Sequence, residues 1–321
     1  MKKRNWLIFI LLTFIILFVG IMISISYDKD HLQVNQFEVK SSKITSPLRL
    51  LLLSDLHDHE FGDGNMELVN KVVAQEPDMV LLLGDFVNAE SADASVPCTL
   101  LENLVKKLPS DVPVYFAIGN HEEGYMAHRA SGQENGEVVG EDVQPSLIME
   151  LEQAGAVVLD KAFVDLEIRG QQVRLGGMYD YAFGLNGEDE AQAAPADVKA
   201  FLREFQDTDA LKIMMAHRPD SFIFGNASAY WDIDLVLSGH VHGGQVVLPF
   251  FGGVWGMDQG WFPEYVHGMY QKDKMNLFVT SGLGSGTQVL PRINNPPEIA
   301  VLDILPEANR ADAGGIMVQN S

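Results

Sequence analysis

The feature that most constrains the fold is a short apolar run that ends in two residues able to bind a metal. Residues 50–53 are four consecutive leucines entered from Pro47, a pattern typical of a strand buried on both faces. Asp55 and His57 follow at once, and side chains two positions apart in an extended segment point the same way. A carboxylate and an imidazole therefore leave the end of a buried strand together, and a divalent metal is one partner that offsets the cost of burying that charge.

Four further apolar runs repeat this pattern along the chain. They end as follows: residues 79–83 in Gly84-Asp85, residues 114–118 in Gly119-Asn120-His121-Glu122, residues 213–216 in His217, and residues 233–237 in a segment that contains His240 and His242. Helical patterns at residues 66–73 and 100–108 separate the first three runs and predict parallel strands joined by right-handed crossovers. Ligands of open α/β sheets bind outside the carboxyl ends of such strands, so we expect these side chains to meet at one edge.

Composition narrows the class of protein. The formal net charge is −22 and no basic stripe is present, so a nucleic-acid duplex is not an expected partner. With 47% hydrophobic and 21% charged residues, the 321-residue chain can bury a large core. Cys98 is the only cysteine, which excludes an intramolecular disulfide and a cysteine-based zinc site.

The first 26 residues predict a membrane-spanning segment. Three basic residues at positions 2–4 precede an uncharged apolar run at residues 6–26, and about 20 residues suffice to cross a bilayer. The basic cluster predicts a cytoplasmic N-terminus, with the rest of the chain outside the cell membrane. The alternative is a signal peptide cleaved near Ser24-Ile25-Ser26, which would leave a secreted protein. Beyond residue 26, 19 basic residues stand against 44 acidic ones, a charge of −25.

We expect one catalytic domain, because the sequence shows no internal repeat and no clear linker. The expected divisions are a cytoplasmic basic end at 1–5, an anchor at 6–26, a juxtamembrane segment at 27–47, the domain at 48–304 and a disordered tail at 305–321. Weak alternation at residues 36–44 indicates an edge strand, and residues 123–144 read as a surface insertion over the site. Residues 156–178 and 265–280 each predict a hairpin, and 298–304 predict the last strand.

Taken in order, the motifs resemble those of the calcineurin-like metallophosphoesterases, over about residues 48–304. The resemblance is nearest to the membrane-associated bacterial phosphodiesterase branch, in which the last histidine motif continues as Gly-Gly-Gln, here residues 243–245. Also typical of that branch are Gly-Leu-Gly at 282–284, Arg292 and Asn-x-Pro-Glu at 295–298. Each motif alone is common by chance, whereas five in order are specific. The resemblance implies an αββα four-layer sandwich of two mixed sheets flanked by helices, preceded here by one transmembrane helix.

The resemblance also implies a site with two divalent ions, residue by residue. Asp55, His57 and His242 would hold the first ion, Asn120, His217 and His240 the second, and Asp85 would bridge them. A hydroxide bridging the ions would attack phosphorus, and His121 would be the catalytic residue that stabilises or protonates the leaving group. Imidazole, carboxylate and amide ligands suit Mn, Zn or Fe better than Ca or Mg. Taken one at a time, Asp55 and Asn120 could instead be turn residues, and His217 could be a buried histidine bonded to the backbone. Five of the nine histidines nevertheless occupy motif positions.

The expected function is that of a monomeric, metal-dependent phosphoric ester hydrolase of the cell envelope, acting on a phosphodiester or a phospholipid-type, lipid-linked substrate. Alternatives are a phosphomonoesterase, a nucleotide pyrophosphatase, or a non-catalytic envelope-binding module that keeps the metal site. Arg292 is a candidate for binding substrate phosphate, or a plain surface cation. Trp255 and Trp261, on an aromatic and glycine-rich segment, are candidates for contact with an acyl chain or lipid headgroups, or else form a hydrophobic lid packed on its own sheet.

Overall fold

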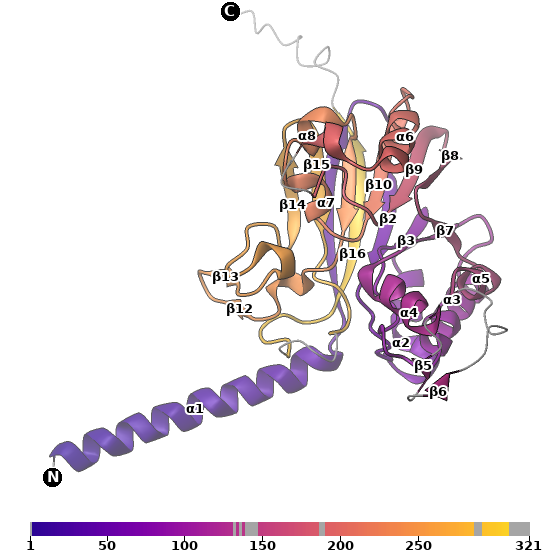
Figure 1. Ribbon diagram of the computed structural model, residues 1–321. Coiled ribbons are helices and arrows are strands. Elements are labelled where there is room, and N and C mark those ends of the chain that lie inside the picture. The colour runs from indigo at the N-terminus through magenta and orange to yellow at the C-terminus, as the bar shows by residue number, and fades with distance from the viewer. Residues whose placement is uncertain are drawn as a thin grey trace, which may run out of the picture.

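The computed structural model of the chain describes residues 2–130, 133–134, 137–138, 147–185, 190–285 and 291–307, which form two six-stranded sheets packed face to face (Figure 1). The first sheet has the order β1 (Gln33–Ser41), β16 (Glu298–Pro306), β2 (Leu48–Leu53), β3 (Met79–Leu82), β4 (Val114–Ala117) and β7 (Val157–Leu159). The second has the order β14 (Gly268–Lys272), β15 (Met275–Val279), β11 (Leu235–Ser238), β10 (Leu211–Ala216), β9 (Gln171–Met178) and β8 (Ala162–Ile168). Each sheet mixes parallel and antiparallel pairs, as expected.

The apolar runs are strands whose two faces enter different cores. Leu50 and Leu52 of β2 pack between the sheets, against residues such as Ile213 and Leu237 of the second sheet. The intervening Leu51 and Leu53 face the helices that cover the first sheet. Because side chains alternate along a strand and both faces are covered, every position must be apolar, which explains the unbroken leucine run.

Helices cover both outer faces and complete the four layers. The first sheet is covered by α2 (Met66–Val73), α3 (Ser95–Lys107) and α5 (Leu147–Gln153), and the second by α6 (Ala196–Phe205), α7 (Asp220–Ile223) and α8 (Ala227–Tyr230). Shorter elements are α4 (Asn120–Ala130), β5 (Gln133–Glu134), β6 (Glu137–Val138), β12 (Val247–Leu248), β13 (Gly252–Gly253), and the 3-10 turns η1 (Asp63–Asn65), η2 (Ala191–Ala193), η3 (His242–Gly244) and η4 (Met257–Gln259). The αββα architecture is therefore confirmed.

Two expected segments differ in detail. Residues 27–47 contribute β1, which pairs with β16 in parallel from Gln33 opposite Glu298 at the edge of the first sheet, so the sheet begins before residue 48. Residues 120–130, which overlap the expected insertion at 123–144, form helix α4. The rest of that insertion, apart from β5 and β6, and residues 308–321 of the expected tail lie outside the described residues. Both expected hairpins are confirmed, as β8–β9 and β14–β15.

The described part of the chain holds one helix that is long and apolar enough to cross a membrane. This helix is α1 (Lys2–Asp30), and its mean hydropathy reaches 3.1 over an 18-residue window with none of that window buried. A single-pass anchor and a signal sequence both fit these properties. The last turns of α1 contact the domain, because Asn294 N–H donates to Ser24 Oγ (2.8 Å) and Asn295 N–H donates to Asp28 Oδ2 (3.3 Å).

A buried carboxylate accepts hydrogen bonds from several segments at the edge of the first sheet. Glu298, at the start of β16, accepts hydrogen bonds from Asn35 of β1 (2.9 Å), Thr280 Oγ1 (2.8 Å) and Ser281 N–H (2.7 Å), and it pairs with His267 Nε2 (2.8 Å). Burial opposes ionisation of Glu298, but the contact with His267 and the other hydrogen bonds lower its pKa to about 2. Burial likewise opposes protonation of His267, but the hydrogen bond to Glu298 outweighs it and raises the pKa of His267.

We expect His267→Gln to lower the Tm more at about pH 6 than at about pH 9. A histidine whose pKa is raised on folding stabilises the fold below its ordinary value of 6.5, and this contribution disappears as the pH rises through the raised pKa. Glutamine keeps a hydrogen-bond donor but carries no charge. Thermal melts of both chains across this pH range measure the difference, and a loss of Tm that does not depend on pH would contradict the ion pair.

Candidate metal centre

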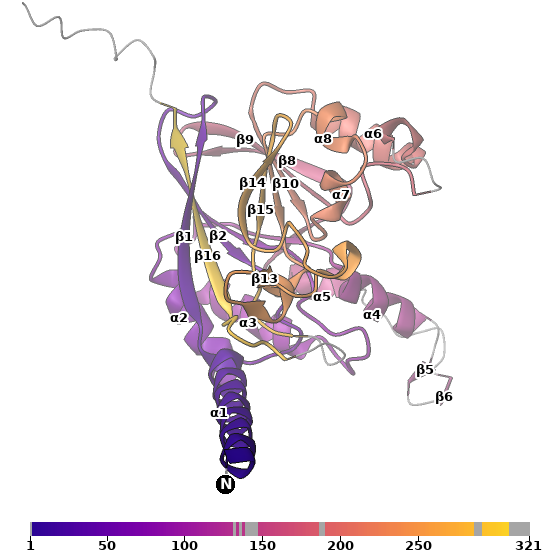
Figure 2. The ribbon, with the colours of Figure 1, turned by 90° about the vertical axis from the view of Figure 1, so that its left-hand side faces the viewer.

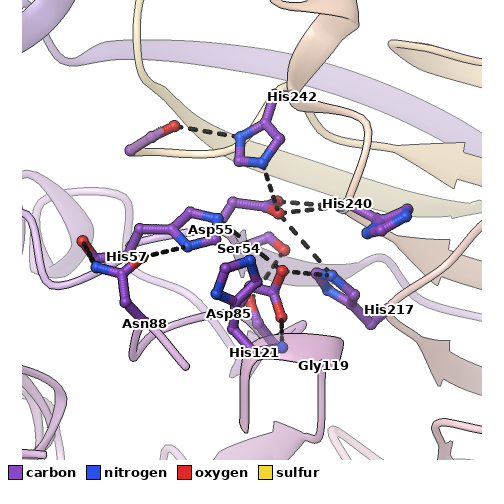
Figure 3. A network of polar contacts seen from close by, with 12 residues as sticks. Ser54, Asp55, His57, Asp85, Asn88, Gly119, His121, His217, His240 and His242 are labelled. Atoms are coloured by element: carbon purple, nitrogen blue, oxygen red, sulfur yellow. Dashed lines mark hydrogen bonds and ion pairs between the residues drawn. The ribbon is translucent and has the colours of Figure 1, made fainter. Parts of the chain in front are cut away.

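All eight residues that the motifs single out lie where strands of the two sheets end on the same side. Asp55 and His57 follow β2, Asp85 follows β3, Asn120 and His121 begin α4 after β4, His217 follows β10, and His240 and His242 follow β11. Figure 3 shows the histidine rings gathered around the carboxylates of Asp55 and Asp85. Residues separated by up to 187 positions therefore form one cluster, because the sheets pack face to face with these strand ends together.

The cluster contains two groups of three ligands that could each hold an ion. One ligand atom from each of Asp55, His57 and His242 lies within 4.8 Å of the others, and the same holds for Asp85, His217 and His240. Two further groups within the same distance share these residues, namely His57, Asp85 and His121, and Asp220, His240 and Asp258. The first two groups coincide with the division into two ion sites that the motifs imply, apart from Asn120.

Unpartnered atoms show that these residues fit a metal ion. Among the described residues, His57 Nε2, Asn120 Oδ1, His217 Nε2 and both ring nitrogens of His240 are buried without a hydrogen-bond partner. His217 Nε2 lies 3.0 Å from Asp85 Oδ2, but not with the alignment of a hydrogen bond. Each unsatisfied buried polar atom costs about 1–3 kcal/mol. Divalent ions coordinated by one such atom from each residue would remove most of this cost.

Hydrogen bonds outside the cluster orient the histidines. Nδ1 of His57 contacts Asn88 Oδ1 (3.2 Å), Nδ1 of His217 contacts the Leu83 carbonyl (2.7 Å), and Nδ1 of His242 contacts the Gly284 carbonyl (3.3 Å). Because each acceptor is an oxygen, Nδ1 carries the proton and Nε2 keeps a lone pair for a metal. His240 differs from these three histidines, because Nε2 rather than Nδ1 faces an oxygen outside the cluster, at 3.5 Å from Asp258 Oδ2.

Burial sets the charge of the candidate ligands. It lowers the pKa of His57 to about 4 and also lowers the pKa of His240 and of His242, so these rings are neutral and able to coordinate. Burial raises the pKa of Asp55 to about 6, although the charge of His217 opposes this shift. It also disfavours charge on Asp85 and His217, but their mutual attraction holds the pKa of Asp85 well below its usual range and raises that of His217 to about 9.

The backbone of the site is left-handed at five candidate ligands, whose φ angles are 56° at Asp55, 50° at His57, 59° at Asp85, 70° at His240 and 45° at His242. Such angles are uncommon outside glycine, cost of order 1–3 kcal/mol each, and persist where the surrounding structure imposes them. The expectation that Asp55 and His57 lie in an extended segment was wrong, because β2 ends at Leu53. Their side chains converge through a tight left-handed turn instead.

Two motif glycines allow backbone to approach the carboxylates. A Cβ on Gly119 would lie 2.2 Å from Asp85 Oδ1, and one on Gly239 would lie 2.0 Å from Ser54 Oγ and 2.5 Å from Asp55 Oδ2. The residues after these glycines then reach the same carboxylates, because His121 N–H donates to Asp85 Oδ1 (2.8 Å) and His240 N–H donates to both oxygens of Asp55 (3.1 and 3.2 Å). Any larger residue would displace the ligand that it faces.

Glu122 has a role that the motif alone did not assign. Its buried carboxylate accepts the N–H groups of Asp85 (2.7 Å), Phe86 (2.7 Å) and Gly119 (2.8 Å), and so joins the chain after β3 to the chain after β4. Burial and the charge of Asp85 raise the pKa of Glu122 to about 7. The only sequence signal was a charged residue directly after the Asn120-His121 pair, where hydrophobic patterning gives no reason for one.

The structure places the three candidate substrate contacts outside the ligand cluster. Arg292 is buried, and its guanidinium donates to the carbonyls of Gly284 (2.7 and 2.9 Å) and Ser281 (2.7 Å), so it supports the loop that hydrogen-bonds His242. Trp255 and Trp261 pack against each other with ring centroids 5.1 Å apart. The turn η4 between them carries Asp258, the residue beside His240.

We expect Glu122→Gln to weaken metal binding by about 10- to 100-fold, the usual effect of removing a partner that supports a ligand. The glutamine amide would present a donor to backbone N–H groups that need an acceptor, and Asp85 would shift. Isothermal titration with Mn²⁺ or Zn²⁺ measures the change. Glu123→Gln is the matched control, because Glu123 is the exposed neighbour in the same helix turn. Equal affinities for the two variants would contradict the role of Glu122.

The chain is similar to several known proteins. The chain is 29% identical over 280 residues to an uncharacterized metallophosphoesterase of Campylobacter jejuni, Cj0846, and covers 63% of that protein's length with 85% of its own. It is 26% identical over 264 residues to phosphodiesterase YaeI of Escherichia coli, covering 83% of that protein with 81% of its own length. A solved dimetal phosphatase from Danio rerio is 11% identical, with a TM-score of 0.38 and coverage of 73% of this chain and 87% of that one.

The decisive match is to a whole family. Residues 48–244, more than half of the chain, match the family model described as calcineurin-like phosphoesterase. That range contains every candidate metal ligand. The two-sheet fold brings these histidines and carboxylates into one cluster that could hold divalent ions. The chain therefore belongs to the calcineurin-like phosphoesterase family and is a metal-dependent phosphoester hydrolase.

Proposed function

We propose that the chain is a dimetal-dependent phosphodiesterase of the cell envelope, in which Asp55, His57 and His242 hold one ion, Asn120, His217 and His240 hold the other, and Asp85 is shared. The observation that carries this proposal is the set of buried, unpartnered ligand atoms divided between two adjoining groups. One ion would leave part of that set unsatisfied. Imidazole, carboxylate and amide ligands together favour Mn, Zn or Fe.

Bound divalent ions would supply Lewis-acid activation of water and of the phosphoryl oxygen. The chain sets the charge of the site, because Asp55 and Asp85 are the only carboxylates in the two ligand groups. Two negative charges against four positive ones leave a local positive charge, which admits an anionic ester into a domain that is strongly acidic overall. His57, His240 and His242 are neutral and leave this balance unchanged.

His121 is placed to assist departure of the leaving group. Its Nδ1 accepts the Ala89 N–H (3.3 Å), so the ring proton belongs on Nε2. The ring stands edge-on to that of His57, with centroids 4.5 Å apart, and it is partly exposed at the border of the cluster. An Nε2–H at this border would donate to the leaving oxygen, an effect worth roughly 10²- to 10⁴-fold for a well-placed acid.

The hydrogen-bonding of Arg292 favours a diester over a monoester. Arg292 donates to backbone carbonyls. All three guanidinium nitrogens of Arg292 are therefore engaged by the backbone, and this side chain has no free edge to clamp the extra charge of a monoester dianion. The name of the YaeI relative, a phosphodiesterase, supports the same choice. With α1 as a single-pass anchor whose basic N-terminus is cytoplasmic, the substrate would be an envelope phosphodiester, and a lipid-linked one is within reach.

We expect the metal-stripped full-length chain in detergent to hydrolyse bis-p-nitrophenyl phosphate only after Mn²⁺ or Zn²⁺ is added, and faster than p-nitrophenyl phosphate. Removing the shared ligand in Asp85→Ala should abolish this activity. The measurement is the release of p-nitrophenol with each metal and with none. Faster hydrolysis of the monoester would indicate a phosphomonoesterase instead of a phosphodiesterase. No hydrolysis of either ester with two ions bound would favour a non-catalytic binding module.

We expect His121→Gln to lower kcat by about 10²-fold or more while the bound metal content stays the same. The loss should be larger for an alkyl ester than for a p-nitrophenyl ester, because a poor leaving group depends more on proton donation. Steady-state kinetics with both esters, together with metal analysis, measure this. His59→Gln is the control, since His59 contacts Asp30 and not the ligand cluster. An equal loss with both esters would contradict the role in leaving-group departure.

A further inference from the structure

An exposed aromatic surface lies beside the metal centre on residues 246–262, here called the aromatic loop. Four of its side chains are largely exposed: Phe250 fully, Phe251 74%, Trp261 67% and Phe262 58%. Elsewhere in the described residues, apart from α1, Phe224 at 38% is the one other exposed phenylalanine or tryptophan. Large apolar side chains gathered in this way on a surface mark a contact with a partner or a membrane.

The loop holds its aromatic side chains outward. Phe250 and Phe262 have left-handed φ angles of 70° and 52°, which are unfavourable for bulky residues. Hydrogen bonds fix this shape, because Phe251 N–H donates to the Leu248 carbonyl (3.1 Å) and Phe262 N–H donates to the Val254 carbonyl (2.9 Å). Strain of this kind persists where the structure imposes it and is found at functional sites. The exposure is therefore a built feature of the loop.

The base of the loop is joined to the end of the apolar helix. Asn294 donates its N–H to Ser24 Oγ of α1 (2.8 Å) and its side-chain amide to the Val247 carbonyl of β12 (3.2 Å). Val247 N–H in turn donates to the Ile293 carbonyl (3.0 Å). Figures 1 and 2 show β13 and the loop around it at the end of the domain from which α1 leaves. A bilayer crossed by α1 would therefore meet this end of the domain.

The charge of the loop indicates which part of a membrane it would meet. Residues 246–262 contain no lysine or arginine, and Asp258 is their one charged residue. Attraction to anionic headgroups is therefore not its basis for binding, whereas tryptophan and phenylalanine favour the boundary between headgroups and acyl chains. We propose that the aromatic loop is a second membrane contact, in which Phe250, Phe251, Trp261 and Phe262 insert into the bilayer surface beside α1.

This contact would couple the membrane surface to the metal centre. Asp258, on the same loop, lies 3.5 Å from His240 Nε2 and accepts a hydrogen bond from the Tyr181 hydroxyl (3.2 Å). Within a few residues, the loop thus carries both exposed aromatic side chains and Asp258, which lies beside the candidate ligand His240. The inference rests on the proposed anchoring by α1, and it deepens the proposed function because a site held at this level would meet phosphodiesters in the headgroup layer.

The test places a fluorophore on the loop of the full-length chain. Cys98→Ser removes the only native thiol, and Phe250→Cys is then labelled with the fluorophore NBD in phosphatidylcholine nanodiscs that hold one chain each. We expect blue-shifted emission that is lost when lipids carrying a nitroxide at the headgroup are included, because interfacial insertion reaches only about 5–10 Å deep. Addition of anionic lipid or salt should not change this result, since the loop has no basic residue.

Val105→Cys is the matched control, because Val105 is an exposed apolar residue (46%) on α3. Its label should stay accessible to aqueous iodide and should be unaffected by the nitroxide lipid. Equal behaviour of the labels at positions 250 and 105 would overturn the inference. So would a label at position 250 that is shielded from iodide but is not quenched by the nitroxide lipid. Failure of the chain to enter the discs would also overturn it. Hydrolysis of the diester is measured on the same samples, so quenching without hydrolysis would disprove the proposed activity and leave the membrane contact standing.

Discussion

The structure depends on burying two carboxylates, Asp55 and Asp85, among histidines, and the same burial keeps His57, His240 and His242 neutral. An isolated buried charge is very unfavourable, and a divalent ion is the partner that lets several such ligands share one small volume. Much of the local structure serves this arrangement. The glycines at 119 and 239 remove side chains that would collide with the carboxylates, and the N–H groups that follow them donate to the same oxygens.

Convergence of the ligands requires strain that the rest of the domain must hold in place. The left-handed backbone at five candidate ligands would be unfavourable in an isolated peptide. They persist because strands buried on both faces lead into them and because outer groups secure the turns that follow. Glu122 accepts hydrogen bonds from the chain after β3 and from Gly119, just before α4. Arg292 donates to the Gly284 carbonyl in the loop that contacts His242. The two sheets act as rigid supports, and the chemistry lies in the loops at their ends.

The same end of the domain carries the features that concern a membrane. The last turns of α1, the segment around Asn294 and the base of the aromatic loop are connected by hydrogen bonds, and Asp258 extends that connection to His240. Under the anchoring proposed above, the position of the domain over a bilayer would affect access to the candidate metal centre. A substrate held in a lipid layer would then approach from the side on which the ions lie, without leaving the membrane.

Local patterns in the sequence were enough to predict the strands, the parallel pairing of the first three, and the candidate ligands that the fold brings together. These follow from local patterns, since continuous apolar runs, intervening helical periodicity and ordered His, Asp and Asn motifs can all be read without tertiary contacts. Tertiary contacts were needed to show how the candidate ligands converge, that Glu122 accepts backbone N–H groups from two loops, and that Arg292 is bonded to carbonyls. The tertiary structure also placed the expected edge strand at residues 33–41 and paired it with β16. The reason is physical: left-handed turns, hydrogen bonds between distant loops and the pairing of residues 33–41 with 298–306 depend on neighbours that only the folded chain brings together.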